Sequence, residues 1–344
     1  MKALVRRRYG GPGVVRVEEV ERPALEDDRV LVRVHASSLN KADWFQLRGW
    51  PRLLRPVTRD GLVRPKSALF GTDFAGVVEA VGKDVTDLAP GDEVFGGRNG
   101  AFAEYVSATN VVRKPANVTF EEASTMGIAG LTALQAVRDR GEVQPGERVL
   151  VNGASGGVGT LTLQIAKAFG AHVTAVCSTR NVEQARALGA DRVLDYTRED
   201  FTREQQRYDV ILDVAGGHSW RAMRGALEPD GRFVLVGAHG SRNVLRHLAA
   251  VWLASRFSKQ TAKFFVTQFN KPDLQTLADL LESGKLKPAI DRTYELSEAG
   301  RIAYVRRGTR PREAGPDDLS RYRPAPWRGS TSERTASAAS SARR

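Results

Sequence analysis

The stretch Asn152-Gly153-Ala154-Ser155-Gly156-Gly157-Val158-Gly159 decides the fold. An apolar run at 148–151 precedes it and an apolar run with helical periodicity follows at 159–169, which predicts a strand, a glycine turn and a helix. Glycines in such a turn let backbone N–H groups approach a diphosphate, and the N-terminal end of the helix faces it with a positive dipole. We therefore predict a dinucleotide-binding turn, with a purely structural turn as the alternative.

Strand and helix patterns continue to alternate after this turn. We predict strands at 172–176, 192–194, 209–213 and 233–237, with helices at 183–188 and 220–227 between them. A helix at 121–140 precedes the turn, and Thr119 with Glu122 forms a predicted capping box at its start. This alternation predicts an α/β fold with a doubly wound parallel sheet.

The first 115 residues have a different pattern. Short runs of β-branched residues at 14–17 and 30–36 alternate with closely spaced glycines, which predicts a small barrel-like β domain. A length of 344 residues is enough for two domains, each with its own core. The composition, 41% hydrophobic and 27% charged, is that of a globular protein.

The end of the second predicted strand indicates which dinucleotide binds. It reads Cys177-Ser178-Thr179-Arg180-Asn181, and the next acidic residue along the chain is Glu183. An acid at this position would hold the ribose 2′-OH of NAD and repel a 2′-phosphate, whereas Arg180 would attract one and the hydroxyls of Ser178 and Thr179 would donate to it. This predicts NADPH as the cofactor. The alternative for Arg180 is a solvated residue at the start of the next helix.

The net charge of +12 is unevenly distributed. Residues 306–344 contain ten arginines and four acidic residues, so half of the excess lies there, and we predict no nucleic-acid partner.

The longest apolar stretch, 245–257, contains three basic residues, and the N-terminus lacks a signal-peptide pattern, so we expect no membrane partner and a cytoplasmic protein. The single cysteine, Cys177, is interpreted as a buried residue rather than a reactive thiol.

Several further motifs carry a family resemblance: 71–82, 91–96, 101–106, 129–134 and Gly189-Ala190-Asp191. With the glycine turn, they resemble the zinc-independent quinone oxidoreductase branch of the medium-chain dehydrogenase/reductase superfamily, from residue 1 to about residue 308. The resemblance implies a GroES-like catalytic domain formed by residues 1–118 and 262–308, and a Rossmann NADP-binding domain at 119–261. It also implies an active site in the cleft between the domains, and a homodimer.

The zinc ligands of related enzymes are missing from this sequence. Zinc-dependent members have a cysteine within the segment that here reads Ser37 to Asp43, and a His-Glu pair where this chain has Thr72-Asp73. The five histidines show no metal-ligand spacing, so we predict that no zinc is bound. Without a Lewis acid, the predicted acceptors of hydride are already electrophilic: a quinone, an enone or a related activated carbonyl.

The resemblance also implies roles for individual residues. Asn40 and Asp43 would line the cleft beside the nicotinamide with Thr132 nearby, backbone groups of Phe265-Val266 would meet the carboxamide, and Tyr196 would border the 2′-phosphate. The alternatives are a turn role for Asn40 and packing roles for Thr132 and Tyr196. No side chain stands out as a general acid, and solvent can supply the proton. A noncatalytic NADPH-binding or interaction protein of the same fold is the alternative function.

The C-terminal segment departs from the resemblance. After Tyr304-Val305 the sequence is rich in arginine and proline and shows no strand pattern, although the resemblance implies a closing apolar strand. Codons for residues 306 onward, read one base later, permit Glu-Glu-Gly-His-Ala-Arg-Gly-Lys-Leu-Val-Leu-Thr, which is the implied ending. We therefore predict a frameshift near Val305, a disordered basic tail at 309–344 and an unpaired sheet edge. A genuine basic interaction tail is the alternative.

Overall fold

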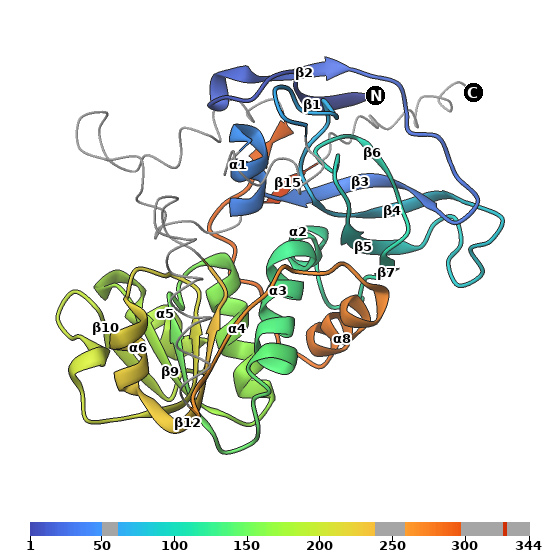
Figure 1. The fold of residues 1–344 in the computed structure, drawn as a ribbon. Coiled ribbons are helices and arrows are strands. Elements are labelled where there is room, and N and C mark those ends of the chain that lie inside the picture. The colour runs from blue at the N-terminus through green and yellow to red at the C-terminus, as the bar shows by residue number, and fades with distance from the viewer. Residues whose placement is uncertain (50–60, 238–258, 297–325, 329–344) are drawn as a thin grey trace, which may run out of the picture.

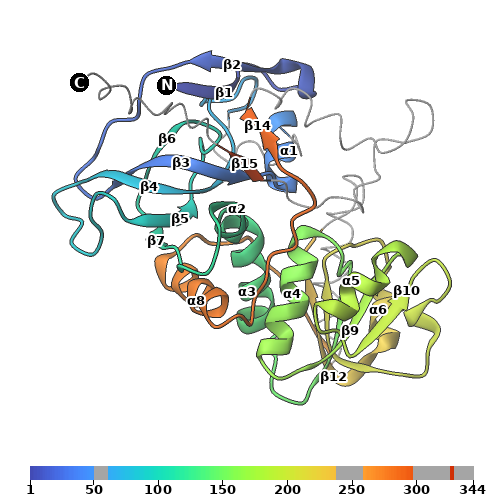
Figure 2. The same cartoon turned by 180° about the vertical axis from the view of Figure 1, so that it is seen from behind.

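The computed structural model describes residues 1–49, 61–237, 259–296 and 326–328. A β-rich domain and a parallel α/β domain lie one above the other, joined by helices (Figure 1). Figure 2 shows the same arrangement from behind, with α8 (Lys271–Glu282) beside these joining helices. The apolar stretch at 245–257 lies outside the described residues.

The α/β domain contains a six-stranded parallel sheet with the order β10-β9-β8-β11-β12-β13. This is the Rossmann order, in which two halves wind outward from the first strand, and it confirms the predicted doubly wound sheet. The strands are β8 (Arg148–Asn152), β9 (His172–Cys177), β10 (Arg192–Asp195), β11 (Tyr208–Asp213), β12 (Leu227–Leu235) and β13 (Thr261–Phe264).

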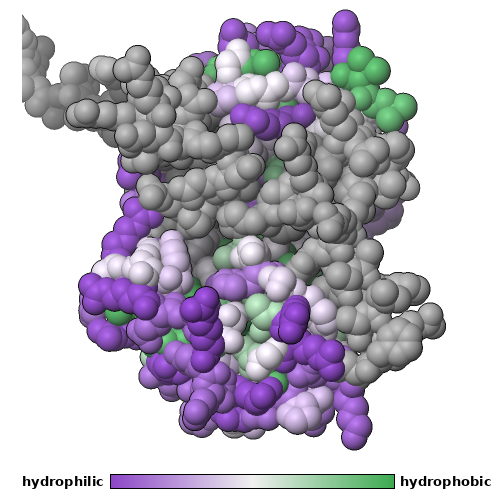
Figure 3. All heavy atoms as spheres, turned by 60° about the vertical axis from the view of Figure 1, so that its left-hand side comes forward, coloured by the Kyte–Doolittle hydropathy of each residue, from purple (hydrophilic) through white to green (hydrophobic). Residues whose placement is uncertain are grey.

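Helices cover this sheet because its strands are apolar on both faces. Among the described helices of this domain the longest is α4, which directly follows the glycine turn and ends before Gly170, a glycine with a φ of +82°. The helical elements are α4 (Gly157–Ala168), η5 (Thr179–Asn181), α5 (Val182–Ala187), η6 (Phe201–Arg203) and α6 (Trp220–Ala226). Figure 3 shows that the described surface of this domain is mainly hydrophilic in that view.

The β-rich domain contains a seven-stranded sheet with the order β14-β15-β3-β4-β5-β7, and β6 pairs with β3 beside this path. Its strands are β3 (Val30–Ser38), β4 (Asp73–Val81), β5 (Glu93–Gly97), β6 (Tyr105–Ala108), β7 (Val111–Arg113), β14 (Tyr294–Glu295) and β15 (Pro326–Arg328). A separate antiparallel pair is formed by β1 (Lys2–Arg6) and β2 (Val15–Glu19), linked by η1 (Pro12–Val14). Helix α1 (Lys41–Arg48) follows β3.

A helical run joins the two domains, consisting of α2 (Phe120–Ser124), η3 (Met126–Gly130), α3 (Leu131–Gln135) and η4 (Ala136–Arg140). The predicted capping box is present: Thr119 N–H donates to Glu122 Oε2 at 2.9 Å, and Glu122 N–H donates to Thr119 Oγ1 at 3.2 Å. One buried cluster includes Phe95 of β5, Leu134 of the run and Val149 of β8. The two domains therefore share a continuous core at this run.

The predicted return point to the catalytic domain, residue 262, falls inside β13, which pairs in parallel with β12. The Rossmann sheet thus extends to Phe264, and the chain rejoins the seven-stranded sheet only at β14, after α8. Helix α8 packs against α3 and β7, between the two sheets. Periodicity does not reveal this, because a short strand at a sheet edge has the same pattern in either sheet.

The predicted tail also differs from expectation at one place. Residues 326–328 form β15, which pairs antiparallel with β3 at Ala36–Ser38 and parallel with β14. The expectation that no strand follows residue 308 was therefore wrong for these three residues. The edge of β3 offers main-chain hydrogen bonds to any extended segment, whatever its side chains. The other residues of 309–344 lie outside the described part of the chain, and the frameshift stays a prediction.

Among the described residues, no helix combines the length and apolar character that crossing a membrane requires.

Candidate active site

The glycine turn joins β8 to α4 with a backbone that only glycine suits. Gly153 has a φ of +87°, and the N–H groups of Gly153 and Ala154 both donate to Val176 O, at 3.1 and 3.0 Å. A Cβ on Gly159 would lie 2.1 Å from Gly153 O. Helix α4 starts after Gly156 without a side-chain cap, so its first N–H groups face the space above the turn. Residues 153–159, which we call the cradle, thus have the backbone geometry that the predicted diphosphate site requires.

The carboxyl ends of β9 and β10 bring together the residues predicted near the adenosine ribose. Tyr196 N–H donates to Cys177 O at 3.1 Å, and the Tyr196 side chain is 53% exposed. Ser178 is half-buried and accepts a hydrogen bond from Asn181, whereas Thr179 and Arg180 are exposed. Within the described part of the chain Arg180 has no ion pair, so its guanidinium is available to an anionic group.

An acid that the sequence argument overlooked lies beside these residues. Strand pairing sets Asp195 opposite Cys177, and Thr179 Oγ1 donates to Asp195 Oδ2 at 2.5 Å. The hydrogen bonds from Thr179 and Thr197 lower the pKa of Asp195. The Thr179 hydroxyl therefore donates its hydrogen bond to the Asp195 carboxylate. This hydrogen bond corrects the predicted role of Thr179 as a donor to a 2′-phosphate. The distance of 18 residues from Cys177 hid this contact, and only the β9–β10 register reveals it.

Cys177 is 1% exposed, as its interpretation as a buried residue requires. Burial, with a smaller contribution from the Asp195 charge, raises the pKa of its thiol to about 11. The thiol is therefore neutral and unreactive near neutral pH.

In the β-rich domain, five polar side chains form a buried group that we call the carboxylate cluster: Ser38, Asn40, Asp43, Thr72 and Asp73. They come from the end of β3, the start of α1 and the start of β4. Asp43 Oδ2 accepts from Asn40 N–H at 2.7 Å, and its Oδ1 accepts from Thr72 Oγ1 at 3.1 Å. The predicted pair Asn40 and Asp43 is thus in direct contact.

Asp73 is the centre of the cluster, although the sequence indicated it only as part of the motif at 71–82, where zinc-dependent members have the Glu of a His-Glu pair. Its Oδ2 accepts from Ser38 Oγ at 2.8 Å and from Asn40 Nδ2 at 2.7 Å, and its Oδ1 accepts from Ile128 N–H at 2.8 Å. A Cβ on Gly127 would lie 2.2 Å from Asp73 Oδ1. The π-helical turn at η3 therefore meets Asp73 directly, and a glycine is needed there. In the sequence, Gly127 is the residue that indicates this close approach of the helical run to Asp73.

Burial changes the protonation of both carboxyl groups. Desolvation, followed by the nearby Asp73 charge, raises the pKa of Asp43 to about 8. Desolvation raises the pKa of Asp73 to about 7, against the opposing effect of its three hydrogen-bond donors. Because those donors favour the anion at Asp73, a proton shared by the pair near neutral pH belongs on Asp43.

The main chain of Ile128 connects the carboxylate cluster to the predicted nicotinamide side of the cleft. Ile128 O accepts from Thr132 Oγ1 at 2.6 Å, and Thr132 Oγ1 lies 2.6 Å from Thr267 Oγ1. Thr267 directly follows Phe265-Val266, and Val266 is 75% exposed after the end of β13. The fold thus brings Asn40, Asp43 and Thr132 into one region, together with the segment at 265–266.

The donor set of the cluster does not suit zinc. An amide stands at Asn40 and a hydroxyl at Thr72, and both already hydrogen bond to carboxylates. Cys177 lies in the other domain, and the described residues contain no group of three His, Cys, Asp or Glu side chains able to hold a metal ion. Zinc favours imidazole and thiolate ligands, and neither is present in the cluster.

Comparisons with known proteins agree with this architecture. A family model described as the alcohol dehydrogenase GroES-like domain matches residues 26–133, and one described as zinc-binding dehydrogenase matches residues 188–308. The chain is 33% identical over 341 residues to NAD(P)H oxidoreductase RTN4IP1, mitochondrial, of Mus musculus, covering 87% of this chain and 84% of that protein. It is 33% identical over 301 residues to trans-enoyl reductase pgmF of Aspergillus terreus, covering 81% and 82%.

Among solved structures, the quinone oxidoreductase from Coxiella burnetii superposes with a TM-score of 0.80 at 28% identity, covering 96% of this chain and 99% of that one. The match spans both domains. The cradle at 153–159, the Rossmann strand order and these relatives lead to one conclusion. The chain belongs to the medium-chain dehydrogenase/reductase superfamily, with an alcohol dehydrogenase-like fold, and is an oxidoreductase of that superfamily.

Proposed function

We propose that this protein uses NADPH to reduce a quinone, an enone or a related activated carbonyl without zinc. The observation that carries the proposal is the carboxylate cluster, a buried hydrogen-bond network at the positions where the resemblance implies zinc ligands in zinc-dependent members. Relatives named NAD(P)H oxidoreductase, quinone oxidoreductase and trans-enoyl reductase support the nicotinamide cofactor and the acceptor class.

The residues of the cradle and of the β9–β10 ends would hold the cofactor. Gly153 to Gly159 would bind the diphosphate, Arg180 with Ser178 and Tyr196 would surround the 2′-phosphate, and Phe265-Val266 would meet the carboxamide. When bound, NADPH supplies the hydride. The preference for NADPH rests on Arg180. The nearby carboxylate of Asp195 accepts hydrogen bonds from the Thr179 and Thr197 hydroxyls, which take up its two oxygens.

Asp43 and Thr72 would transfer a proton to the reduced acceptor. Asp43 is 2% exposed and holds a proton near neutral pH, and its Oδ1 lies 3.1 Å from Thr72 Oγ1. In the relay that we propose, the protonated Asp43 Oδ1 would donate to Thr72 Oγ1, which reverses the hydrogen bond seen in the structure. The Thr72 hydroxyl would give its own proton to the acceptor oxygen and take the proton of Asp43, and water would then reprotonate Asp43. This adds a candidate general acid, Asp43, to the expectation that solvent can supply the proton. Asn40, held by Asp73, would orient the acceptor by hydrogen bonding.

A panel of quinones, enones and aldehydes, with NADPH oxidation followed by absorbance, tests the reaction. We expect turnover of at least one quinone or enone, and a decline of kcat/KM above pH 8 that Asp43→Asn removes. Tight NADPH binding without turnover of any acceptor would instead favour the noncatalytic alternative.

Zinc independence has its own test. Protein purified without added metal should contain far less than one zinc per chain by elemental analysis, and a chelator should leave its turnover unchanged. Stoichiometric zinc would end this part of the proposal.

We also propose a homodimer that acts on small molecules in the cytoplasm and binds no nucleic acid. The single buried cysteine is compatible with a reducing compartment. Sedimentation of the purified chain would test the dimer, and a nucleic-acid binding assay would test the role of the basic tail.

A further inference from the structure

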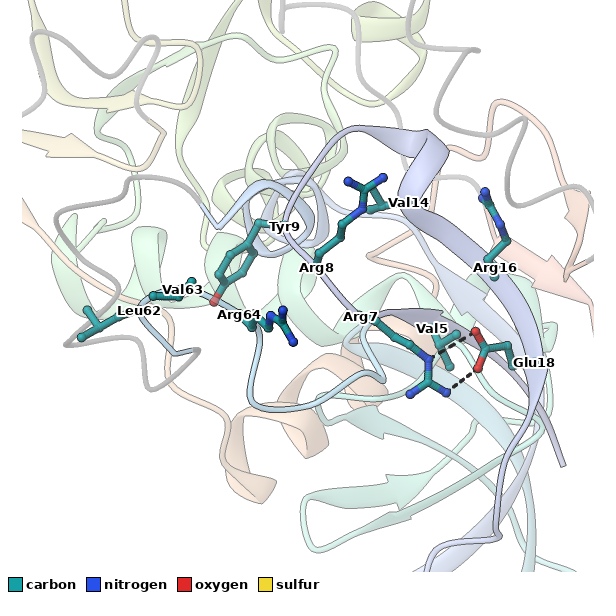
Figure 4. Close-up of a pocket in the computed structure, with 10 residues that line it drawn as sticks. All are labelled: Val5, Arg7, Arg8, Tyr9, Val14, Arg16, Glu18, Leu62, Val63 and Arg64. Carbon is teal, nitrogen blue, oxygen red and sulfur yellow. Dashed lines mark hydrogen bonds and ion pairs between the residues drawn. The ribbon is translucent and has the colours of Figure 1, made fainter.

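A groove lies between the β1–β2 hairpin and residues 61–64, in the β-rich domain and away from the glycine cradle (Figure 4). The hairpin forms the end of the molecule opposite the Rossmann sheet (Figures 1 and 2). The groove has a volume of about 700 Å³. We call it the arginine groove, and the lining residues that matter here are Arg7, Arg8, Arg16, Leu62, Val63 and Arg64.

The lining of the groove is strongly positive. The lining contains four guanidinium groups and one carboxylate, that of Glu18, so its net charge is +3. Glu18 pairs with Arg7 at 2.6 Å, and Arg16 donates to backbone carbonyls of its own hairpin. Arg8 and Arg64 are exposed and have no ion pair within the described residues. The groove therefore attracts an anionic partner.

Two aliphatic side chains stand at its rim. Val63 is 83% exposed, the highest value for a large hydrophobic side chain in the described part of the chain, and Leu62 is 63% exposed. They follow Gly61, which has a φ of +87°, and Tyr9 Oη donates to Gly61 O at 2.8 Å. The turn is thus tied to the hairpin at its start, and it presents Leu62 and Val63 to water.

The directions of the arginines indicate the kind of partner. In Figure 4 the four guanidinium groups point to different sides of the groove, and they do not converge on one point. One bound phosphate needs convergent donors, whereas an array of headgroups suits spread charges. Exposed aliphatic side chains beside arginines are the combination that enters the interface of an anionic bilayer.

We propose that the arginine groove binds an anionic lipid surface, with Leu62 and Val63 entering the interface and Arg8 and Arg64 contacting headgroup phosphates. This binding is peripheral and independent of the reaction proposed above. Our expectation of no membrane partner rested on the short apolar stretch and the missing signal-peptide pattern, and neither bears on peripheral binding.

Cosedimentation of the full chain with vesicles tests the proposal. We expect binding to vesicles of phosphatidylglycerol and phosphatidylcholine, and little binding to phosphatidylcholine alone. The double variant Arg8→Glu/Arg64→Glu should weaken binding about tenfold or more, because each basic residue near the surface contributes substantially. Leu62→Ser/Val63→Ser should also weaken it, and all variants should keep the melting temperature of the parent protein.

Matched controls separate the groove from the arginine-rich tail. Arg186→Glu/Arg203→Glu makes the same change of charge on the exposed Rossmann surface, and Leu25→Ser removes an exposed aliphatic side chain elsewhere. Both controls should bind vesicles like the parent. Absence of binding to anionic vesicles, unchanged binding of the groove variants, or equal weakening in the charge control would overturn the proposal. So would competition by millimolar inorganic phosphate at constant ionic strength, which would indicate a discrete phosphate site.

Discussion

The glycine cradle and the carboxylate cluster reach specificity in opposite ways. The cradle is one continuous stretch at 153–159, and it works through backbone groups made accessible by the absence of side chains. The cluster takes side chains from β3, α1 and β4, buries them and satisfies them with one another. A motif made of consecutive backbone groups keeps its geometry without side chains from other elements. A buried polar network, in contrast, depends on the position of every element that supplies a side chain to it.

The largest effect should come from removing the centre of the network. Asp73→Ala removes the acceptor of Ser38 Oγ and of the Ile128 N–H, at about 1–3 kcal/mol each, and leaves Asn40 Nδ2 with Ser38 as its acceptor. We expect the free energy of unfolding to fall by about 3 kcal/mol or more, and kcat/KM to fall at least about a hundredfold.

Denaturant titration and steady-state kinetics measure these two losses. Asp73→Asn keeps the shape of the side chain and should lose less of both quantities. Glu79→Gln, an exposed position on the same strand, is the control and should change little. If the Asp73→Ala variant were fully active, activity would not depend on the hydrogen-bond network of the cluster.

The next effect concerns the cradle. Gly159→Ala places a methyl group 2.1 Å from Gly153 O, so the turn must open and its N–H groups must move. We expect the Kd for NADPH, measured by fluorescence titration, to rise by about a hundredfold, equivalent to about 3 kcal/mol. Gly225→Ala is the matched control, because a Cβ at this helical glycine meets nothing within 4 Å. An unchanged Kd for Gly159→Ala would contradict the cradle as a diphosphate site.

The third prediction concerns pH and distinguishes the two regions, because only the cluster contains raised carboxyl pKa values. The pKa of Asp43 is raised from 3.8 to about 8 by burial, so the folded state binds more protons than the unfolded state between these values. The free energy of unfolding should therefore fall as pH rises from 4 to 8, by up to about 1.4 kcal/mol per pH unit for one group.

Urea unfolding at several pH values measures this slope. Asp43→Asn should make the slope shallower and should remove it between pH 7 and 8, because Asp73, with its pKa raised to about 7, still contributes at lower pH. Asp84→Asn, at an exposed position, should leave the slope as in the parent protein. If the free energy of unfolding of the parent protein rose from pH 4 to 8, and Asp43→Asn had the same slope, the raised pKa of Asp43 would be refuted.

The smallest effect concerns cofactor preference. NADPH should bind at least about tenfold more tightly than NADH, because Arg180 is exposed and has no ion pair among the described residues. Arg180→Glu should remove or reverse this preference and leave NADH binding largely intact. Arg186→Glu, at the next exposed arginine of α5, should keep it. Equal affinities in the parent protein would disprove the assignment of NADPH.

Sequence patterns alone determined the cradle, the Rossmann sheet and the helical run at 120–140, including its capping box. The reason is that periodicity, glycine spacing and caps are local, and each is readable within one or two elements. Asn40 and Asp43, the pair that the resemblance implies, are the N-cap and the third residue of α1, so their contact is local in the sequence.

Only the tertiary structure decided the rest. Asp73 became the centre of the cluster because β3, β4 and η3 meet there, and Asp195 reached Thr179 through the register of two parallel strands. The assignment of β13 to the Rossmann sheet, and of residues 326–328 to the edge of β3, also depended on main-chain pairing that no side-chain pattern encodes. The protonation of Asp43 follows from burial, and burial is a property of the assembled fold rather than of any segment.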